Sequence, residues 1–254
     1  MPQLPKLVNV EAGELKMSVL DSQINPRVIV ALDYPDAGQA MHLVGRLSPR
    51  LCRLKVGKEL FTAAGPTLVR RLVDDGYEVF LDLKFHDIPN TVHKAVAAAA
   101  RLGVWMINVH ALGGRDMLLA AREAAVTADQ RELRLIAVSV LTSTSQAGLE
   151  EIGIHKSIEQ EVIDLTTLSL ECGLDGMVCS ALEASSIRQR FGPEPLLVTP
   201  GIRPAGSASD DQHRIMTPRR AIDSGASYLV IGRPVTAHRD PLRQLEEINR
   251  SLAS

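Results

Sequence analysis

Eight short apolar runs recur along the chain, and helix-like segments of about 15 to 35 residues separate consecutive runs. Short strands that alternate with helices are typical of right-handed βαβ units, which build a parallel sheet. Eight repeats favour a closed barrel over an open sheet, so the predicted fold class is α/β, a single (β/α)8 TIM barrel. The runs are Val28 to Asp33, Arg53 to Gly57, Val79 to Lys84, Trp105 to His110, Arg134 to Val140, Asp175 to Ser180, Leu196 to Ile202 and Tyr228 to Arg233.

The length of the chain, 254 residues, fits one barrel of this kind as a single domain. We predict that residues 27–254 form the barrel and that residues 1–26 form an N-terminal extension. Between the runs, the alanine-rich segment Thr91 to Leu102 predicts a helix, with Asn90 as its N-cap and Gly103 at its end.

The formal net charge is −2 and 45% of the residues are apolar, which gives no basis for a nucleic acid partner. No stretch of about 18 apolar residues occurs, and the first 26 residues lack the continuous apolar region of a secretory signal. We therefore expect no membrane partner and a cytoplasmic location. The cysteines Cys52, Cys172 and Cys179 form no C-x-x-C pair and are predicted to be free buried thiols.

The sequence predicts neither a metal nor an organic cofactor. Its seven histidines form no H-E-x-x-H motif, the cysteines are too scattered for zinc, and neither glycine-rich nucleotide motif occurs. His86 lies inside the most charged run of the chain, where we expect a structural hydrogen-bonding role for it.

The segment DLKFHDIPNTV, from Asp82 to Val92, places acid, base and acid at the end of a predicted strand. Residues two apart on a strand face the same side, so Asp82 and Lys84 are predicted to meet, with Asp87 in the loop that follows. A neighbouring carboxylate favours the charged ammonium form of lysine, which is a proton donor rather than a nucleophile. A lone D-x-K pattern is also consistent with a solvated ion pair.

Other predicted strands end in polar residues too, and the active site of a barrel lies where strands end. They supply Asp33, Lys55 and Thr142, while the last two strands lead into Arg203, Gly232 and Arg233. The last two βα loops are the usual phosphate site of a barrel. The loop Arg203 to Arg214, rich in Gly, Ser, Pro and Asp, is predicted to act as a closing lid that carries Gln212.

Six motifs, VALD, KVG, DLKFHDIPNTV, LTS, TPGIRP and IGRP, follow one another between Val28 and about His238. In this order and spacing the chain resembles the orotidine 5′-phosphate decarboxylase family, whose members convert orotidine monophosphate to uridine monophosphate and carbon dioxide. The resemblance implies a homodimer in which Asp87 and Thr91 reach the partner's site.

The resemblance also implies a role for each matching residue. Lys84 would protonate the carbon that loses carbon dioxide, and Asp82 would lie against the departing carboxylate. An alternating catalytic array would be formed by Lys55, Asp82, Lys84 and Asp87. The ribose would be contacted by Asp33 and Lys55, and the pyrimidine by Thr142. Gln212 would contact both the base and the phosphate, and the phosphate would also be held by Arg203, Gly232 and Arg233.

Three alternatives stay open on the sequence alone. A magnesium-dependent decarboxylase of a keto-sugar phosphate uses a similar Asp-x-Lys-x-x-Asp run on the same scaffold. A Schiff-base aldolase is a weaker alternative, because imine chemistry needs a neutral lysine. A silent nucleotide-binding barrel is the third, since fold alone never establishes activity.

Overall fold

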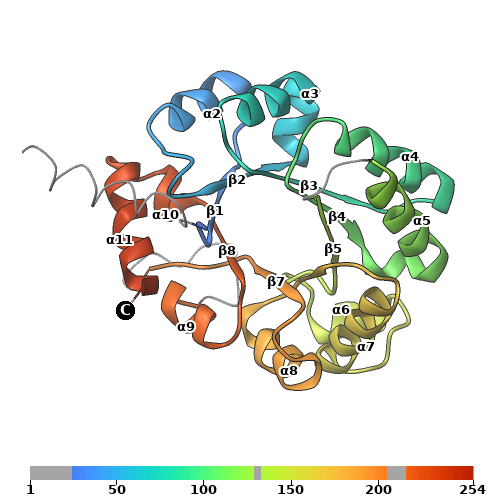
Figure 1. The fold of residues 1–254 in the computed structure, drawn as a ribbon. Coiled ribbons are helices and arrows are strands. Elements are labelled where there is room, and N and C mark those ends of the chain that lie inside the picture. The colour runs from blue at the N-terminus through green and yellow to red at the C-terminus, as the bar shows by residue number, and fades with distance from the viewer. Residues whose placement is uncertain (1–24, 129–132, 205–215, 254) are drawn as a thin grey trace, which may run out of the picture.

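Eight parallel strands close into a barrel in chain order, and the eighth strand pairs with the first (Figure 1). The computed structural model describes residues 25–128, 133–204 and 216–253. The predicted (β/α)8 barrel is confirmed. The strands are β1 (Val28–Leu32), β2 (Arg53–Gly57), β3 (Val79–Phe85), β4 (Met106–His110), β5 (Arg134–Val138), β6 (Gly176–Val178), β7 (Leu196–Thr199) and β8 (Tyr228–Ile231).

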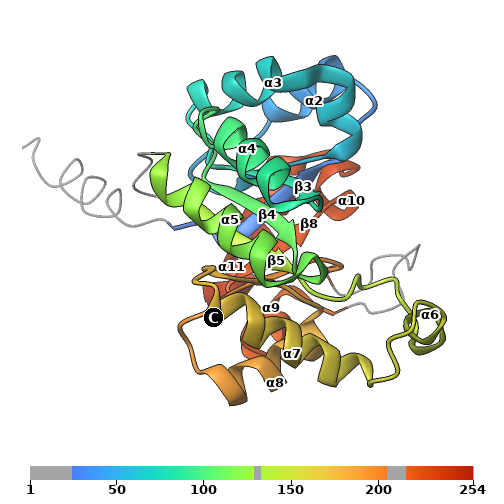
Figure 2. The same ribbon diagram turned by 90° about the vertical axis from the view of Figure 1, so that its right-hand side faces the viewer.

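Helices surround the barrel, and α6 stands out beyond the strand ends (Figure 2). The helices before β5 are α2 (Ala37–Val44), α3 (Lys58–Asp74), α4 (Pro89–Ala100) and α5 (Gly114–Thr127), the last preceded by a 3-10 turn, η1 (Ala111–Gly113). The later helices are α6 (Gln146–Glu151), α7 (Ile158–Glu171), α8 (Ala181–Phe191), α9 (Pro218–Asp223), α10 (Arg233–Thr236) and α11 (Pro241–Ala253).

The start of α4 differs from the prediction. Its N-cap is Ile88 and not Asn90, and Pro89 occupies the first turn. Proline suits this position because its fixed φ matches the helix and its missing N–H would have no intrahelical acceptor there. The proline therefore begins the helix two residues earlier than the polar cap predicted.

Alternating residues of the strands build two apolar layers. On β1, Val28, Val30 and Leu32 pack outward against the helices, whereas Ile29 and Ala31 face the barrel interior. Strands buried on both faces read as continuous apolar runs, which is why the run pattern located all eight of them. The interior is a packed core in which large side chains such as Phe80 and Met106 are almost fully buried.

Arg53 fills the barrel at the amino ends of the strands. Its guanidinium lies 4.2 Å from the ring centre of Trp105 and 4.8 Å from that of Tyr228, and it forms a 2.6 Å ion pair with Glu78. It also donates to the carbonyl of Pro26. A cation over aromatic faces that has a carboxylate partner tolerates burial, and Arg53 is only 4% exposed. This end of the barrel is therefore closed.

Three other predictions concern the cysteines, membrane-spanning helices and the N-terminal extension. Cys52, Cys172 and Cys179 are free and buried. Among the described helices, none combines the length and the apolar character that crossing a bilayer requires. The predicted extension at residues 1–26 lies outside the described residues except for its last two, so the proposed domain division stays a prediction.

Candidate active site

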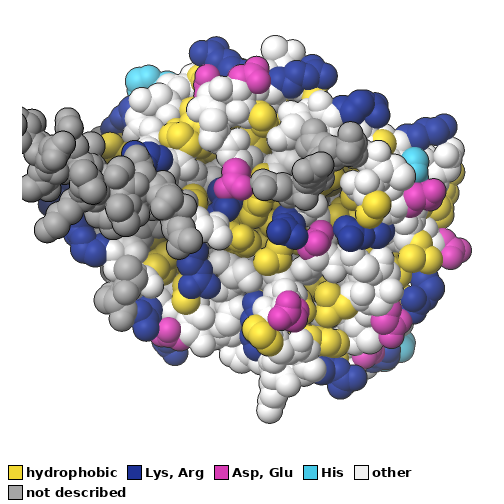
Figure 3. Space-filling view, in the orientation of Figure 1, with side chains coloured by type: hydrophobic (Ala, Val, Ile, Leu, Met, Phe, Trp, Pro, Cys, Tyr) yellow, Lys and Arg dark blue, Asp and Glu magenta, His cyan; other side chains and the backbone are white. Residues whose placement is uncertain are grey.

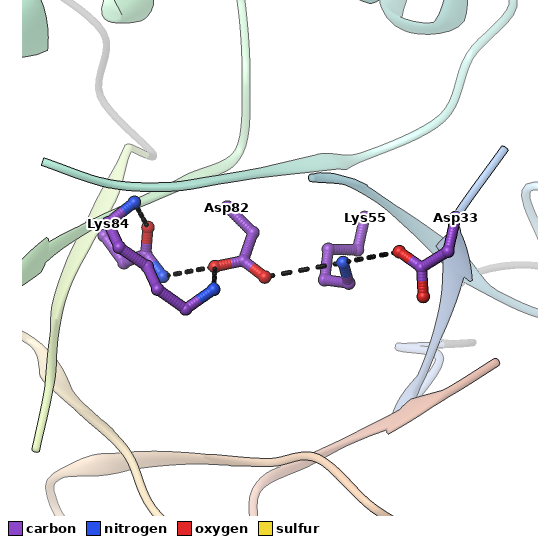
Figure 4. A network of polar contacts seen from close by, with 5 residues as sticks. Asp33, Lys55, Asp82 and Lys84 are labelled. Carbon is purple, nitrogen blue, oxygen red and sulfur yellow. Dashed lines mark hydrogen bonds and ion pairs between the residues drawn. The ribbon is translucent and has the colours of Figure 1, made fainter. Parts of the chain in front are cut away.

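Four charged side chains form a continuous row across the carboxyl ends of β1 to β3 (Figure 4). The Lys55 ammonium lies 3.1 Å from the Asp33 carboxylate and 3.4 Å from the Asp82 carboxylate. The other oxygen of Asp82 accepts a 2.6 Å hydrogen bond from Lys84. Strands β1, β2 and β3 are neighbours in the barrel, so residues at their ends meet although the chain separates them. The structure thus brings Asp33, Lys55, Asp82 and Lys84 together as the sequence predicted.

Asp82 is the centre of this row, and its environment keeps it ionised. Burial alone would raise the pKa of Asp82, but the nearby ammonium groups of Lys55 and Lys84 lower it. Hydrogen bonds from Lys84 and from the Asn108 amide add to that effect, so the pKa lies below its ordinary value. The carboxylate therefore stays negative at neutral pH and holds one ammonium group on each oxygen.

Lys84 has an unusual backbone for a residue with a side chain. Its φ is 51°, and it alone among the described non-glycine residues has a positive φ. Such a left-handed conformation costs about 1 to 2 kcal/mol for an L-residue and is typical of functional sites. It coincides with a break in the β3–β4 register between Leu81 and Phe85, a bulge of the kind that re-aims a side chain.

A cavity of about 320 Å³ opens beside the charged row. That volume is at the small end of the range for small-molecule sites, in which apolar walls surround a few polar groups. Its apolar walls include Ala31, Phe80, Val138, Val178, Val198 and Val230. Figure 3 shows side chains of both charges around the centre of this face, with apolar atoms between them. The cavity therefore combines apolar walls with a few charged groups, as small-molecule sites do.

Residues predicted to bind phosphate also line the cavity. Arg203, Gly232 and Arg233 line it, as does Thr142 in the turn after β5. Arg203 is buried whereas Arg233 is exposed. A Cβ atom on Gly232 would lie 3.8 Å from Ala31 and 3.9 Å from Asp33, which places this glycine next to the charged row.

Two of the predicted residues lie outside this charged row. Asp87 and Thr91 are exposed, and among the described residues no ion pair links Asp87 to Lys84. Asp87 accepts a 2.6 Å hydrogen bond from the backbone N–H of Ile88 instead. Gln212 lies outside the described residues, as does most of the proposed lid.

His86 stacks on His110, with ring centres 5.4 Å apart and an angle of 23° between the planes. Burial, together with the charges of His86, Lys58 and Lys84, lowers the pKa of His110 to about 4. His110 is therefore neutral at pH 7 and adds no positive charge beside Lys84. The contact gives His86 a packing role in place of the hydrogen bond that the sequence led us to expect.

Two residues of the site escaped the sequence analysis. Asn108, on β4, donates a 2.7 Å hydrogen bond to Asp82 and accepts a 2.8 Å bond from the backbone of Lys84. Gly57 leaves room for Lys55, because a Cβ there would lie 3.1 Å from its ammonium nitrogen. The sequence signal for Asn108 was an amide within the apolar run MINVH. The signal for Gly57 was its position two residues after Lys55, a charged residue on a predicted strand.

No cluster of three or more His, Cys, Asp or Glu side chains suited to a metal ion occurs in the described ranges. The acidic residues of the row, Asp33 and Asp82, are each paired with lysine.

Known proteins resemble this chain over nearly its whole length. A family model described as orotidine 5′-phosphate decarboxylase / HUMPS family matches residues 26–248. The orotidine 5′-phosphate decarboxylase of Nitrosospira multiformis is 57% identical over 228 residues, which cover 90% of this chain and 94% of the relative. That of Vibrio cholerae is also 57% identical over 228 residues, covering 90% of this chain and 99% of the relative.

A solved structure agrees in both fold and sequence. The crystal structure of orotidine 5′-phosphate decarboxylase from Lactobacillus acidophilus superposes with a TM-score of 0.82 at 36% identity. The match covers 91% of this chain and 100% of that one.

Proposed function

The chain belongs to the orotidine 5′-phosphate decarboxylase / HUMPS family, and on that premise we propose that Lys84 is the proton donor of its reaction. The reaction is the decarboxylation of orotidine 5′-monophosphate to uridine 5′-monophosphate and carbon dioxide in de novo pyrimidine biosynthesis, which makes the chain a carboxy-lyase. One observation carries the proposal. The Lys84 ammonium is held 2.6 Å from a buried carboxylate at the edge of an apolar cavity.

Decarboxylation breaks the bond between a ring carbon and its carboxylate, and the bonding electrons stay on the ring carbon. A fixed positive charge close to that carbon stabilises the negative charge as it develops. Lys84 supplies the charge, and its N–H then donates the proton that replaces carbon dioxide. The resulting neutral amine takes up a proton from water before the next turnover.

Asp82 keeps this machinery in place. Its two oxygens hold Lys84 and Lys55, so neither ammonium group reorganises when charge develops in the substrate. We place the departing carboxylate next to Asp82. Asp33 and Lys55 are proposed to contact the ribose, and Thr142 the pyrimidine edge. Arg203, Gly232, Arg233 and Gln212 are proposed for the phosphate end, with Gln212 also reaching the base.

The direct test of the proposal is the loss of absorbance of orotidine 5′-monophosphate on incubation with the purified chain. We expect turnover, unchanged by EDTA, because the charge that stabilises the carbanion is an ammonium group. Loss of activity in EDTA that Mg²⁺ restores would favour the keto-sugar-phosphate alternative. Complete inactivity would favour a silent nucleotide-binding barrel. Covalent trapping of a ketose phosphate by borohydride would indicate the aldolase.

Phosphate binding gives a separate prediction for Arg233. The variant Arg233→Ala is expected to weaken binding of uridine monophosphate by about 10- to 150-fold, since a hydrogen bond to a charged group contributes about 1.5 to 3 kcal/mol. Uridine, which lacks the phosphate, should bind nearly as before. Calorimetric titration with both ligands measures the difference, and Arg243→Ala, an exposed arginine paired with Glu247 on α11, is the control. Equal losses for both ligands would assign Arg233 a structural role.

We also propose a homodimer whose active sites include Asp87 and Thr91 of the partner subunit. Both residues are exposed in the single chain, next to Ile88, whose side chain is 66% exposed. A second hollow of about 290 Å³ adjoins the charged row, and its lining adds Lys58 and Glu59 to the four residues of the row. A partner loop that entered this hollow would bring its carboxylate close to Lys58 and Lys84. We further propose that the enzyme is cytoplasmic and has no nucleic acid or membrane partner.

A further inference from the structure

Asn108 is a fully buried polar residue in the middle of β4, inside an otherwise apolar strand. Its side-chain oxygen accepts the backbone N–H of Lys84 at 2.8 Å, and its side-chain nitrogen donates to Asp82 at 2.7 Å. A buried amide with both ends satisfied is stable, whereas one with a missing partner destabilises its surroundings. The two bonds therefore define one geometry for Asn108 and for the two residues that it contacts.

The hydrogen bond between Lys84 and Asn108 lies where the bulge interrupts the pairing of β3 with β4. Leu81 pairs with Ile107 and Phe85 with Val109, so four steps along β3 correspond to two steps along β4. Lys84 lies within this bulge, and its N–H donates to the Asn108 side chain. Because a buried N–H requires an acceptor, the Asn108 carbonyl lets Lys84 keep its left-handed backbone without an unsatisfied donor.

The amide also has only one useful orientation. If its oxygen and nitrogen were exchanged, a carbonyl would face the Asp82 carboxylate and an NH2 group would face the Lys84 N–H. Both contacts would be repulsive, so the network itself fixes which atom points where. Neither an ionised carboxylate nor an apolar side chain at this position provides an acceptor at one end and a donor at the other.

We infer that Asn108 is a positioning residue for decarboxylation, which clamps the Lys84 backbone and the Asp82 carboxylate so that the Lys84 ammonium stays aimed at the reacting carbon. It acts through Lys84 and Asp82 and touches no reacting atom. The inference rests on the proposed function of Lys84. It predicts that loss of the clamp lowers the rate of chemistry more than it weakens nucleotide binding.

The first test compares Asn108→Ala with Ser139→Ala. Ser139 is equally buried and donates to the Val178 carbonyl at 3.0 Å, so its side-chain hydrogen bond goes to the backbone and not to the charged row. Asn108→Ala is expected to lower kcat by about 10²-fold, the effect of a misplacement of about 1 Å, while uridine monophosphate binds within about threefold of the unchanged chain. Ser139→Ala should keep its kcat. Equal kcat values for the two variants, or a parallel loss of binding, would reject the inference.

The second test uses the pH profile of Asn108→Asp. A protonated carboxyl group at position 108 offers one acceptor and one O–H donor, the same pattern as the amide. Two carboxyl groups in contact raise the pKa of one of them, so this form persists at mildly acidic pH. We expect kcat, relative to the unchanged chain, to fall as the pH rises and the new group ionises. A profile parallel to that of the unchanged chain would reject the inference.

Two further measurements distinguish a folding defect from a loss of function. Circular dichroism and binding of uridine monophosphate are measured on each variant before kinetics, and failure of both variants to fold would make Asn108 a folding determinant and reject the inference. If the unchanged chain fails to decarboxylate orotidine 5′-monophosphate, the proposed function fails. If it is active and the Asn108 variants match it, only the role of Asn108 fails.

Discussion

A Lys84→Ala variant is expected to lose decarboxylation while it still folds and binds uridine monophosphate. Loss of a general acid alone lowers a rate by about 10²- to 10⁴-fold, and loss of the charge that stabilises the carbanion adds to this. The fold should persist because Asp82 keeps Lys55 at 3.4 Å and the Asn108 amide at 2.7 Å. Loss of absorbance of orotidine 5′-monophosphate measures the rate, and calorimetric titration measures binding of the nucleotide product.

The matched control for this prediction is Lys156→Ala. Lys156 is also a lysine paired with a carboxylate, Asp164 at 2.7 Å, but it lies exposed between α6 and α7. Removing it deletes a surface ion pair that solvent screens, and should leave turnover unchanged. Near-normal turnover of a folded Lys84→Ala variant would contradict the assignment of the proton donor.

Mixing inactive variants is expected to restore activity if the site is shared between subunits. Lys84→Ala and Asp87→Ala homodimers should each be nearly inactive. In a mixed dimer, the Asp87→Ala chain keeps its own Lys84 and receives an intact Asp87 from its partner. One complete site forms in each mixed dimer, and random pairing makes half of the dimers mixed, so activity should approach roughly one quarter of the original under closed two-fold symmetry.

Asp82 provides the control for the mixing experiment. Asp82 and Lys84 contact each other within one chain at 2.6 Å, so a mixture of Asp82→Ala with Lys84→Ala leaves every site incomplete. It should restore nothing. Subunit exchange is verified by mass spectrometry in both mixtures. If exchange is complete and the Asp87→Ala mixture also stays inactive, Asp87 serves its own chain and the shared site is rejected.

The sequence predicted the strands more accurately than their ends. The runs Arg134 to Val140 and Leu196 to Ile202 continue past the observed strands, which end at Val138 and Thr199. The cause is that apolar character indicates burial, whereas a strand requires ladder hydrogen bonds. Val140 and Ile202 are buried because they pack in the hydrophobic core, although both lie beyond the strands and Ile202 forms only an isolated bridge with Met216.

The charged row was predictable because its members lie in or just after the carboxyl-terminal parts of strands, but the support around it was not. The alternation rule placed Asp82 and Lys84 on one side of β3, and they do meet, although through a bulge that the rule does not contain. A bulge depends on two strands at once, and neither apolar run reveals it alone. Asn108 therefore cannot be recognised as a site residue from the sequence until the pairing of β3 with β4 is known.

The Arg53 cluster, which closes the amino end of the barrel, has a consequence for how ligands reach the site. With that end filled, orotidine 5′-monophosphate enters and both products leave by the mouth that the charged row borders. Uridine monophosphate therefore occupies the same space as the next substrate molecule. We therefore expect uridine monophosphate and orotidine 5′-monophosphate to exclude each other from the site.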